Sequence, residues 1–459
     1  MKTNVRQTTS FVTHEGAPAK RINAELELRR SVMACMLWED SFYEDGHSIA
    51  ERIASLVGEV DPVKCANIAI EAREKMKLRH APLWVALSMA KLPEHKKHVA
   101  ATLTRIIQRV DEIAEFLSLY WLDGKKPISA QIKKGLAGAF LKFDEYSFAK
   151  YNRDGAIKLR DVMFMVHPKP ANAEQELLFK KIANNELATP DTWEVALSAG
   201  NDKKETWERL ITENKLGGMA ALRNLRNMQE VGLSDDVIKK AIESVKTERI
   251  LPYRFITAAR YAPQFEPILE EKMVSSIGES KLPGKTVLLV DVSGSMNDRL
   301  TAKSDMNRID AACGLAILLR EICEDVKIYS FSMALKQIPA RRGFALRDAI
   351  MTSQEHSGTP LGLAVQSIYA PITFVGSVAS FGYYGAREVD YHGQALTPDR
   401  LIVITDEQSS DAVQNPINKG YMINVSTEKR GVGYGKWLHL DGFSEAIVDY
   451  IREYETELV

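Results

Sequence analysis

The sequence has little that would mark a secreted, disulfide-stabilised or membrane protein. Its cysteines are few and no Cys-x-x-Cys spacing occurs, which argues against a disulfide framework or a thiolate metal site. They are Cys35, Cys65, Cys313 and Cys323. No apolar run approaches the roughly 18 residues needed to cross a bilayer. The first residues, Met1 to Arg6, lack the apolar core of a secretory signal. We therefore expect a cytoplasmic protein with no membrane partner.

The chain also lacks an overall charge of one sign. Its 60 Lys and Arg residues nearly balance its 61 Asp and Glu residues. The balance is uneven locally, because the segment from Gly124 to Pro170 holds ten basic and four acidic residues. A concentrated positive segment matters more than the total charge when the partner is a polyanion. The 459 residues are enough for two to four domains of ordinary size.

From about Arg21 to Gly278 the hydrophobic pattern predicts helices almost throughout. Apolar residues recur on one helical face, as from Ile49 to Val60 and from Val99 to Val110. Short connections with Pro, Gly or Asp separate these segments. Such a series predicts stacked helix pairs of the HEAT type. A compact helical bundle is the alternative.

The last part of the chain predicts a doubly wound α/β domain. The runs Thr286–Val290 and Leu401–Thr405 are short, apolar and rich in β-branched residues, as buried parallel strands are. Asp291 follows the first strand and Asp406 follows the second. Since ligands bind beyond the carboxyl ends of strands in open α/β sheets, we expect both aspartates at the same edge.

Hydroxyl side chains accompany these two aspartates. Asp291, Ser293 and Ser295 form an Asp-x-Ser-x-Ser motif, and Thr359 lies in Ser357-Gly-Thr-Pro360, which predicts a helix start with Thr359 as the N-cap. Two carboxylates and three hydroxyls are hard oxygen ligands that suit Mg²⁺ or Mn²⁺. The alternative is an ordinary turn whose side chains cap a helix. No Ser–His or Cys–His pair lies nearby in the sequence to activate a nucleophile, so we expect no enzyme activity.

The basic segment also contains regularly placed aromatic residues. Phe143, Tyr146, Phe148 and Tyr151 alternate with Lys and Arg. Cations can contact phosphates while aromatic faces stack on unpaired bases, so this pattern favours RNA binding. The alternative is that the aromatic residues belong to the core and the lysines to a solvated helix face.

The set Asp291, Ser293, Ser295, Thr359 and Asp406 resembles the metal-ion-dependent adhesion site of a von Willebrand factor A domain. The resemblance extends from Pro283 to the C-terminus. It implies a Mg²⁺ ion with one coordination position open for a carboxylate of a protein partner. Such a site holds a partner and performs no chemistry.

The whole chain resembles the TROVE family of Ro-type RNA-binding proteins. The motifs that carry the resemblance are His80-Ala-Pro-Leu-Trp, Arg160-Asp-Val-Met with His167-Pro, and the C-terminal Trp437-Leu-His-Leu-Asp-Gly-Phe-Ser444. The resemblance implies a helical-repeat toroid over residues 1–280 and a von Willebrand factor A domain over residues 281–459. It also implies binding of small structured noncoding RNAs, called Y RNAs, and of the single-stranded ends of misfolded RNAs.

The residues carried over from this resemblance are basic. Lys150, Arg153, Arg160 and His167 match the family pattern, and Lys142 and Lys158 are added for their charge alone. The chain departs from the pattern at Leu159, where relatives have a histidine, so the identity of the RNA partner is open. The Gly-, Tyr- and Phe-rich segment 371–398 is expected to be a surface loop at the sheet edge opposite the metal.

These observations predict an RNA-binding protein that forms a ribonucleoprotein. Two alternatives stay open. One is a scaffold in which the A domain recruits a protein through Mg²⁺ and the helices bind another protein. The other is a metal-dependent nuclease, which would remove RNA when Mg²⁺ is added.

Overall fold

The structure is a computed structural model that describes residues 11–40, 44–152, 155, 157–277, 280–300, 306–371, 373–378 and 387–457. It divides into two compact units that do not follow the chain in order. One unit comprises Met1–Ala34, Trp38–His47 and Leu251–Val459, and the other comprises Cys35–Leu37 and Ser48–Ile250. The first helix and the helices between residues 251 and 280 therefore belong to the same compact unit as the sheet. Independent folding of residues 1–280 and 281–459 stays a prediction.

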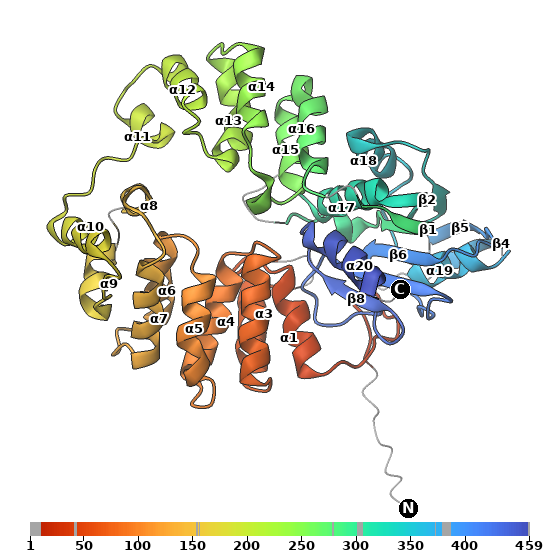
Figure 1. The fold of residues 1–459 in the computed structure, drawn as a ribbon. Helices are drawn as coiled ribbons and strands as arrows, with labels where there is room; N and C mark the ends of the chain where they lie inside the picture. The colour runs from red at the N-terminus through yellow and green to blue at the C-terminus, as the bar shows by residue number, and fades with distance from the viewer. Residues whose placement is uncertain are drawn as a thin grey trace, which may run out of the picture. The chain divides into compact units, whose positions relative to one another are not determined.

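The helical unit is built from short helices joined by short connections, and α3 to α7 lie side by side along it (Figure 1). No helix in the described part of the chain is both long and apolar enough to cross a bilayer. The helices are α2 (Gly46–Val57), α3 (Pro62–Glu74), α4 (His80–Lys91), α5 (Lys96–Ile106), α6 (Asp111–Tyr120), α7 (Ala130–Phe140), α8 (Glu145–Tyr151), α9 (Leu159–Val166), α10 (Ala173–Asn184), α11 (Trp193–Ser198), α12 (Lys203–Thr212), α13 (Gly218–Glu230) and α14 (Asp235–Glu243).

Two glycines let α5 and α7 pack closely. A Cβ atom at Gly135 would lie 2.8 Å from the Cβ of Leu103, and one at Gly138 would lie 2.5 Å from the Oγ1 of Thr104. The Thr104 hydroxyl donates to the Gly135 carbonyl at 3.1 Å. The predicted apolar face of α5 is buried here, with Leu103 and Ile106 fully inaccessible. Small residues at this crossing therefore fix the distance between the two helices.

The second unit is a mixed sheet with helices on both faces. The sheet has six strands in the order β3-β2-β1-β6-β7-β8, all parallel except β3 at one edge. Its elements are α1 (Ala24–Met33), α15 (Tyr253–Tyr261), α16 (Glu266–Val274), β1 (Leu282–Asp291), α17 (Arg308–Ile322), β2 (Cys323–Phe331), β3 (Leu335–Gln337), α18 (Gly343–Met351), α19 (Leu361–Tyr369), β4 (Thr373–Val378), β5 (Arg387–His392), β6 (Arg400–Thr405), β7 (Lys419–Asn424), β8 (Leu438–Asp441) and α20 (Ala446–Glu457).

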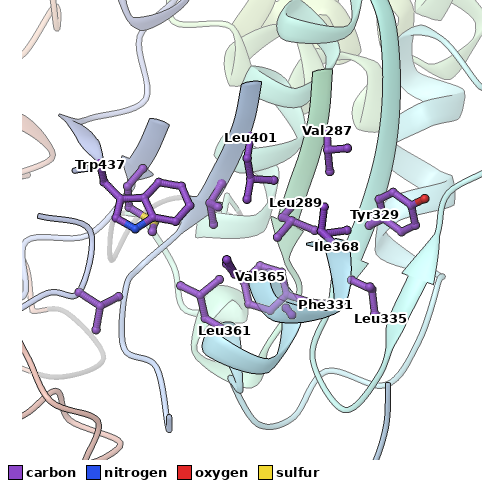
Figure 2. Close-up of a cluster of buried hydrophobic side chains, with 14 of the residues drawn as sticks. Val287, Leu289, Tyr329, Phe331, Leu335, Leu361, Val365, Ile368, Leu401 and Trp437 are labelled. Atoms are coloured by element: carbon purple, nitrogen blue, oxygen red, sulfur yellow. The ribbon is translucent and has the colours of Figure 1, made fainter. Parts of the chain in front are cut away.

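Both faces of the central strands are covered, as their uninterrupted apolar sequences predict. On one face, α19 packs its Leu361, Val365 and Ile368 against Leu289 and Leu401 of β1 and β6 (Figure 2). On the other face lies α17, which is buried along nearly its whole length and contacts β1, β2 and β6. The predicted α/β domain is thus present, and its two helix layers hold the ends of β1 and β6 in place.

Candidate functional site

Strands β1 and β6 end beside each other and bring the two aspartates together. The strands pair in parallel, with Val290 opposite Ile404. The Thr405 hydroxyl donates to the Asp291 Oδ2 atom at 2.5 Å, which links the last residue of β6 to the last residue of β1. Asp291 and Asp406 are both fully buried. The structure therefore confirms the prediction that the ends of these two strands lie together.

The hydroxyl residues of the motif gather at the same edge. The Ser293 amide donates to the Asp291 Oδ1 atom at 2.8 Å, and the Ser293 and Ser295 hydroxyl oxygens lie 3.3 Å apart. The Gly294 amide donates to the Ser357 carbonyl at 2.8 Å, which attaches the segment leading to Thr359. The Ser410 amide donates to the Thr359 carbonyl at 2.9 Å, so all five predicted ligands lie at one end of the sheet.

The predicted role of Thr359 as a helix cap is wrong. Helix α19 begins at Leu361, after Pro360. Its first amides are capped by the Asp411 carboxylate, which accepts from Gly362 at 2.7 Å and from Leu363 at 2.6 Å. A carboxylate at a helix N-terminus satisfies unpaired amides and complements the helix dipole. Asp411 thus does the capping that the sequence assigned to Thr359.

The electrostatics of this edge suit a divalent cation. Burial, followed by the charge of the neighbouring Asp406, raises the pKa of Asp291 to about 7. Two buried carboxylates repel each other unless a cation or a proton compensates them. The donor set of carboxylate and hydroxyl oxygens fits Mg²⁺ or Mn²⁺. Across the described ranges, no three His, Cys, Asp or Glu side chains are grouped to hold a metal, so a metal at this edge would need the hydroxyl groups as ligands.

A buried ionic cluster next to this site was not found from the sequence. The Arg30 Nη1 atom of α1 lies 2.7 Å from Glu407 Oε1, and neither side chain is exposed. His439 on β8 contacts Glu407 and lies 3.3 Å from Asp441. Burial alone would lower the pKa of His439, but Asp441 and Glu407 overcome this effect and raise it to about 9. Arg30 and Glu407 are 377 positions apart in the sequence, so no local pattern indicated their contact.

The sequence had suggested that segment 371–398 lies opposite the candidate metal edge, but its described strands β4 and β5 do not. Its strands β4 and β5 form an antiparallel pair. The Asp390 amide donates to the Met333 carbonyl at 2.9 Å, and the Tyr391 hydroxyl donates to the Ser332 carbonyl at 2.6 Å. Ser332 follows β2 at its carboxyl end, so the β4–β5 pair is attached at the same side as Asp291. Tyr391 itself is a fully buried core residue.

Among the predicted RNA contacts, Lys142 is exposed but already has hydrogen-bond partners in the protein. Its Nζ atom donates to the carbonyls of Thr104, Arg105 and Ile107 at 2.8, 3.4 and 2.6 Å. These carbonyls lie at the end of α5, where a positive charge stabilises the helix. Burial of the ammonium group lowers the pKa of Lys142. Lys142 therefore stabilises the end of α5.

Lys150 and Arg160 lie beside accessible aromatic rings. The Lys150 Nζ atom is 6.0 Å from the centre of the Tyr146 ring and 5.8 Å from that of Tyr151. The Arg160 guanidinium lies 5.6 Å from the Phe164 ring. Tyr146 and Phe164 are 44% and 49% exposed. These pairs are the mixed cation and aromatic surface that the sequence predicted.

The remaining residues predicted to bind RNA are Lys158, His167 and Arg153. Lys158 precedes α9, and His167 follows it in the left-handed conformation with φ of +50°. Both residues are exposed. Arg153 lies outside the described residues. Phe148 is fully buried and stacks on Phe140 at 5.6 Å, so the core interpretation holds for this one aromatic residue and not for Tyr146.

A groove near these residues adds cations that sequence reasoning missed. It has a volume of about 1240 Å³ and lies along α5, α7 and the start of α8. Lys97 and Lys134 line it from α5 and α7. Both are exposed, and no ion pair to either is found among the described residues. Arg105 lines it too but is paired with Glu74 at 2.6 Å. Lys97 lies outside the basic segment, which is why charge counting did not select it.

Comparison with known proteins identifies part of the helical region. Residues 184–279 match the TROVE domain. The matched residues begin after the segment that holds Lys142 to His167, so the TROVE match does not itself cover the predicted RNA contacts.

Two individual proteins are also similar to this chain. The chain is 24% identical to telomerase protein component 1 of Mus musculus over 328 residues, which is 52% of this chain and 12% of the relative. It is 22% identical to telomerase protein component 1 of Rattus norvegicus over 440 residues, or 74% of this chain and 16% of the relative. The chain thus spans less than a fifth of the length of these relatives.

A solved structure supports the fold. The crystal structure of the Deinococcus radiodurans RO (RSR) protein superposes with a TM-score of 0.57 at 16% sequence identity, over 95% of this chain and all of that one. The likeness confirms the predicted fold class, a helical region followed by an α/β domain. The predicted resemblance to Ro-type proteins is thus confirmed at the level of the fold.

Proposed function

We propose that this TROVE-domain protein binds RNA through its helical unit and forms a ribonucleoprotein with a small structured noncoding RNA. It binds single-stranded RNA ends as well and performs no chemistry on them. The names of the matched proteins support this proposal, since one group is a telomerase component and the solved structure is of a Ro protein. Y-like RNAs and a role in RNA quality control belong to the same proposal.

The observation that carries the proposal is the pairing of cations with accessible aromatic rings. Tyr146, which is 44% exposed, has the Lys150 Nζ atom at 6.0 Å from its ring centre. Arg160 and Phe164 form a second such pair. A base can stack on such a ring or on the guanidinium plane while the cation contacts a phosphate. A face built only for solvation does not require exposed aromatic rings beside the cations.

The groove along α5 and α7 offers a second set of contacts. Lys97 and Lys134 face an open volume that also presents the amide side chains of Gln108 and Gln131. Cations suit phosphates, and amide groups can donate to or accept from base edges and ribose hydroxyls. This combination fits a single strand of RNA better than an acidic protein surface, which would not need the amides.

The A domain has a separate role in this proposal. Asp291, Ser293, Ser295, Thr359 and Asp406 hold Mg²⁺ or Mn²⁺, which binds a carboxylate of a protein partner. The cation supplies positive charge and an oxygen-binding position there. The cation site is dispensable for RNA binding, because its acidic ligands repel phosphates.

Native purification followed by binding measurements tests the RNA proposal. We expect absorbance at 260 nm from RNA that co-purifies, and sequencing identifies it. The variant with Lys97→Glu and Lys134→Glu should bind a small structured RNA at least about tenfold more weakly at moderate salt. The matched control carries Lys203→Glu and Lys204→Glu at the start of α12, outside the groove. An equal loss of RNA affinity in both variants would indicate a general effect of net charge.

The two alternatives give different results in the same experiment. A scaffold purifies without nucleic acid, and its groove variant binds RNA no less than the wild type does. A metal-dependent nuclease shortens the RNA when Mg²⁺ is added, and Asp291→Asn stops the cleavage. RNA that stays intact with Mg²⁺ present, together with loss of binding in the groove variant only, supports the proposed function.

A further inference from the structure

Arg109 lies where the groove meets the surface of α8 that carries Lys150. Its neighbour Gln108 lines the groove, and so does Ser147 of α8. Tyr151 follows Ser147 at the i+4 position, which places both residues on one face of that helix. The Arg109 guanidinium lies 4.8 Å from the centre of the Tyr151 ring. The groove and the surface around Lys150 are therefore connected through Arg109.

Two carboxylates hold Arg109 in this position. The Glu112 Oε2 atom accepts from the Arg109 amide at 3.0 Å and from the Gln108 amide at 2.8 Å, and the Glu112 side chain is fully buried. Asp111 accepts from the guanidinium at two points, from Nε at 3.2 Å and from Nη2 at 2.9 Å. One carboxylate thus fixes the backbone of Arg109, and the other fixes the plane of its guanidinium.

The restrained guanidinium still has hydrogen-bond donors to offer. Its bonds to Asp111 come from Nε and Nη2, and within the described ranges its Nη1 atom has no hydrogen-bond partner. The Arg109 side chain is 38% exposed. An arginine that is already held in place and still presents N–H groups can bind a phosphate with little further loss of side-chain freedom.

Arg109 depends on Asp111 more than the neighbouring Arg79 does. Arg79 also contacts Asp111, at 2.6 Å, but it lies 2.8 Å from Glu115 and 3.4 Å from Glu112 as well. In the described part of the chain, the ion pair of Arg109 is with Asp111 alone. Loss of the Asp111 charge therefore releases the Arg109 side chain while Arg79 keeps two partners.

We infer that Arg109 binds a phosphate of one RNA single strand that runs from the groove onto α8, and that Asp111 is the positioning residue of this contact. The inference rests on the proposed RNA function and narrows the ligand of this surface to a single strand. Lys97 and Lys134 contact phosphates within the groove, and the exposed ring of Tyr146 stacks on a base beyond Arg109. A duplex keeps its bases stacked on each other and offers none to Tyr146.

Neutralising Asp111 tests the inference through the sign of the effect. Removing an acid near a polyanion normally raises the affinity, because it removes repulsion. For Asp111→Asn we expect the reverse, a loss of roughly fivefold or more in affinity for a fluorescein-labelled oligouridylate of about 12 nucleotides, since the guanidinium loses its two charged bonds. Asp123→Asn is the matched control, because Asp123 is exposed beyond the other end of α6. Its affinity should equal that of the wild type or exceed it.

Two further measurements connect the effect to Arg109. The log–log salt slope of Asp111→Asn should flatten by about 0.7, as for one lost phosphate contact, although no cation has been removed. Arg109→Lys keeps the charge but loses the planar fork of donors, so its affinity for the oligouridylate should fall too. The variant with both changes should bind as weakly as Arg109→Lys alone, because Asp111 acts through Arg109.

The outcomes distinguish this inference from the proposed function. If Asp111→Asn binds the oligouridylate as well as the wild type or better, while the variant with Lys97→Glu and Lys134→Glu is weakened, the inference is wrong and RNA binding by the groove stands. A weakened Asp111→Asn with an unchanged salt slope, or additive losses in the double variant, would make Asp111 a structural residue only and overturn the inference too. If the wild type binds neither the oligouridylate nor a small structured RNA, the proposed function itself is wrong.

Discussion

Arg30 and Glu407 form a fully buried ion pair, with Arg30 Nη1 2.7 Å from Glu407 Oε1, and so attach the first helix to the loop that carries Asp406. Glu407 also accepts from the Gly433 amide at 2.7 Å. The Arg30 guanidinium donates to the carbonyl of Arg430 at 3.0 Å as well. A helix at the beginning of the sequence thereby positions the candidate metal edge formed near its end.

Replacing only one member of this pair should be costly. Arg30→Met leaves the Glu407 charge buried beside a single cation, and we expect a loss of about 3–5 kcal/mol in the free energy of unfolding. Urea denaturation measures it. Arg452→Met, which removes a partly exposed pair with Asp449, should cost less than about 1 kcal/mol. A loss of similar size in both variants would contradict the assignment of a special role to Arg30.

Removing the charge of Asp291 should have opposite effects with and without metal. Asp291→Asn keeps an acceptor for the Ser293 amide but takes away a ligand charge, so added Mg²⁺ or Mn²⁺ should no longer raise the melting temperature. Without metal the variant should be at least as stable as the wild type at pH 8, because the repulsion with Asp406 disappears. A thermal shift with Mg²⁺ that persists in Asp291→Asn would place the metal elsewhere.

The pKa of His439 predicts a decline of stability in mildly alkaline solution. The value of about 9 lies above that of an unfolded histidine, so the protonated ring stabilises the fold. This contribution is fully present below pH about 6.5 and is lost progressively as the pH rises to about 9, with a total on the order of 3 kcal/mol. Denaturation midpoints across this range measure it. His439→Gln should flatten the decline; an unchanged slope would assign it to another group.

Lys142 and Lys150 should respond differently to substitution. Lys150→Glu with Arg160→Glu should lower RNA affinity and flatten the log–log salt dependence by about one unit per lost phosphate contact. Lys142→Met should mainly lower the stability of the helical unit, because the carbonyls at the end of α5 lose their donor. Filter binding at several salt concentrations and thermal denaturation separate the two effects. A salt slope reduced by Lys142→Met alone would return this residue to the RNA surface.

The stability of an isolated A domain should depend on where the chain is cut. A fragment of residues 281–459 lacks α15, whose Tyr253 ring meets Phe443 at 5.6 Å and whose Arg260 pairs with Asp310. We expect it to be less stable than residues 251–459 by at least about 3 kcal/mol, from lost burial of residues such as Phe255 and Ile256. Denaturant unfolding of both fragments tests this. Equal stabilities would favour the boundary at residue 280.

The sequence by itself determined the elements and the identity of the candidate ligands. Apolar periodicity distinguishes amphipathic helices from buried strands, because burial imposes a period of 3.6 residues on the one and continuous apolarity on the other. It also placed Asp291 and Asp406 at one edge, because the ends of parallel strands must meet there. Such features depend on neighbouring residues and on topology rules that apply to every sheet of this class.

Only the tertiary structure decided which polar groups are already occupied. It showed that Asp411 caps α19 in place of Thr359 and that the Lys142 ammonium caps α5. It also brought Arg30 to Glu407, and Thr13 and His14 to the loop after Asp406. These partners are separated by tens to hundreds of residues, and a hydrogen bond or ion pair depends on position within a few tenths of an ångström. Local sequence carries no record of such distances, so packing alone assigned these side chains their partners.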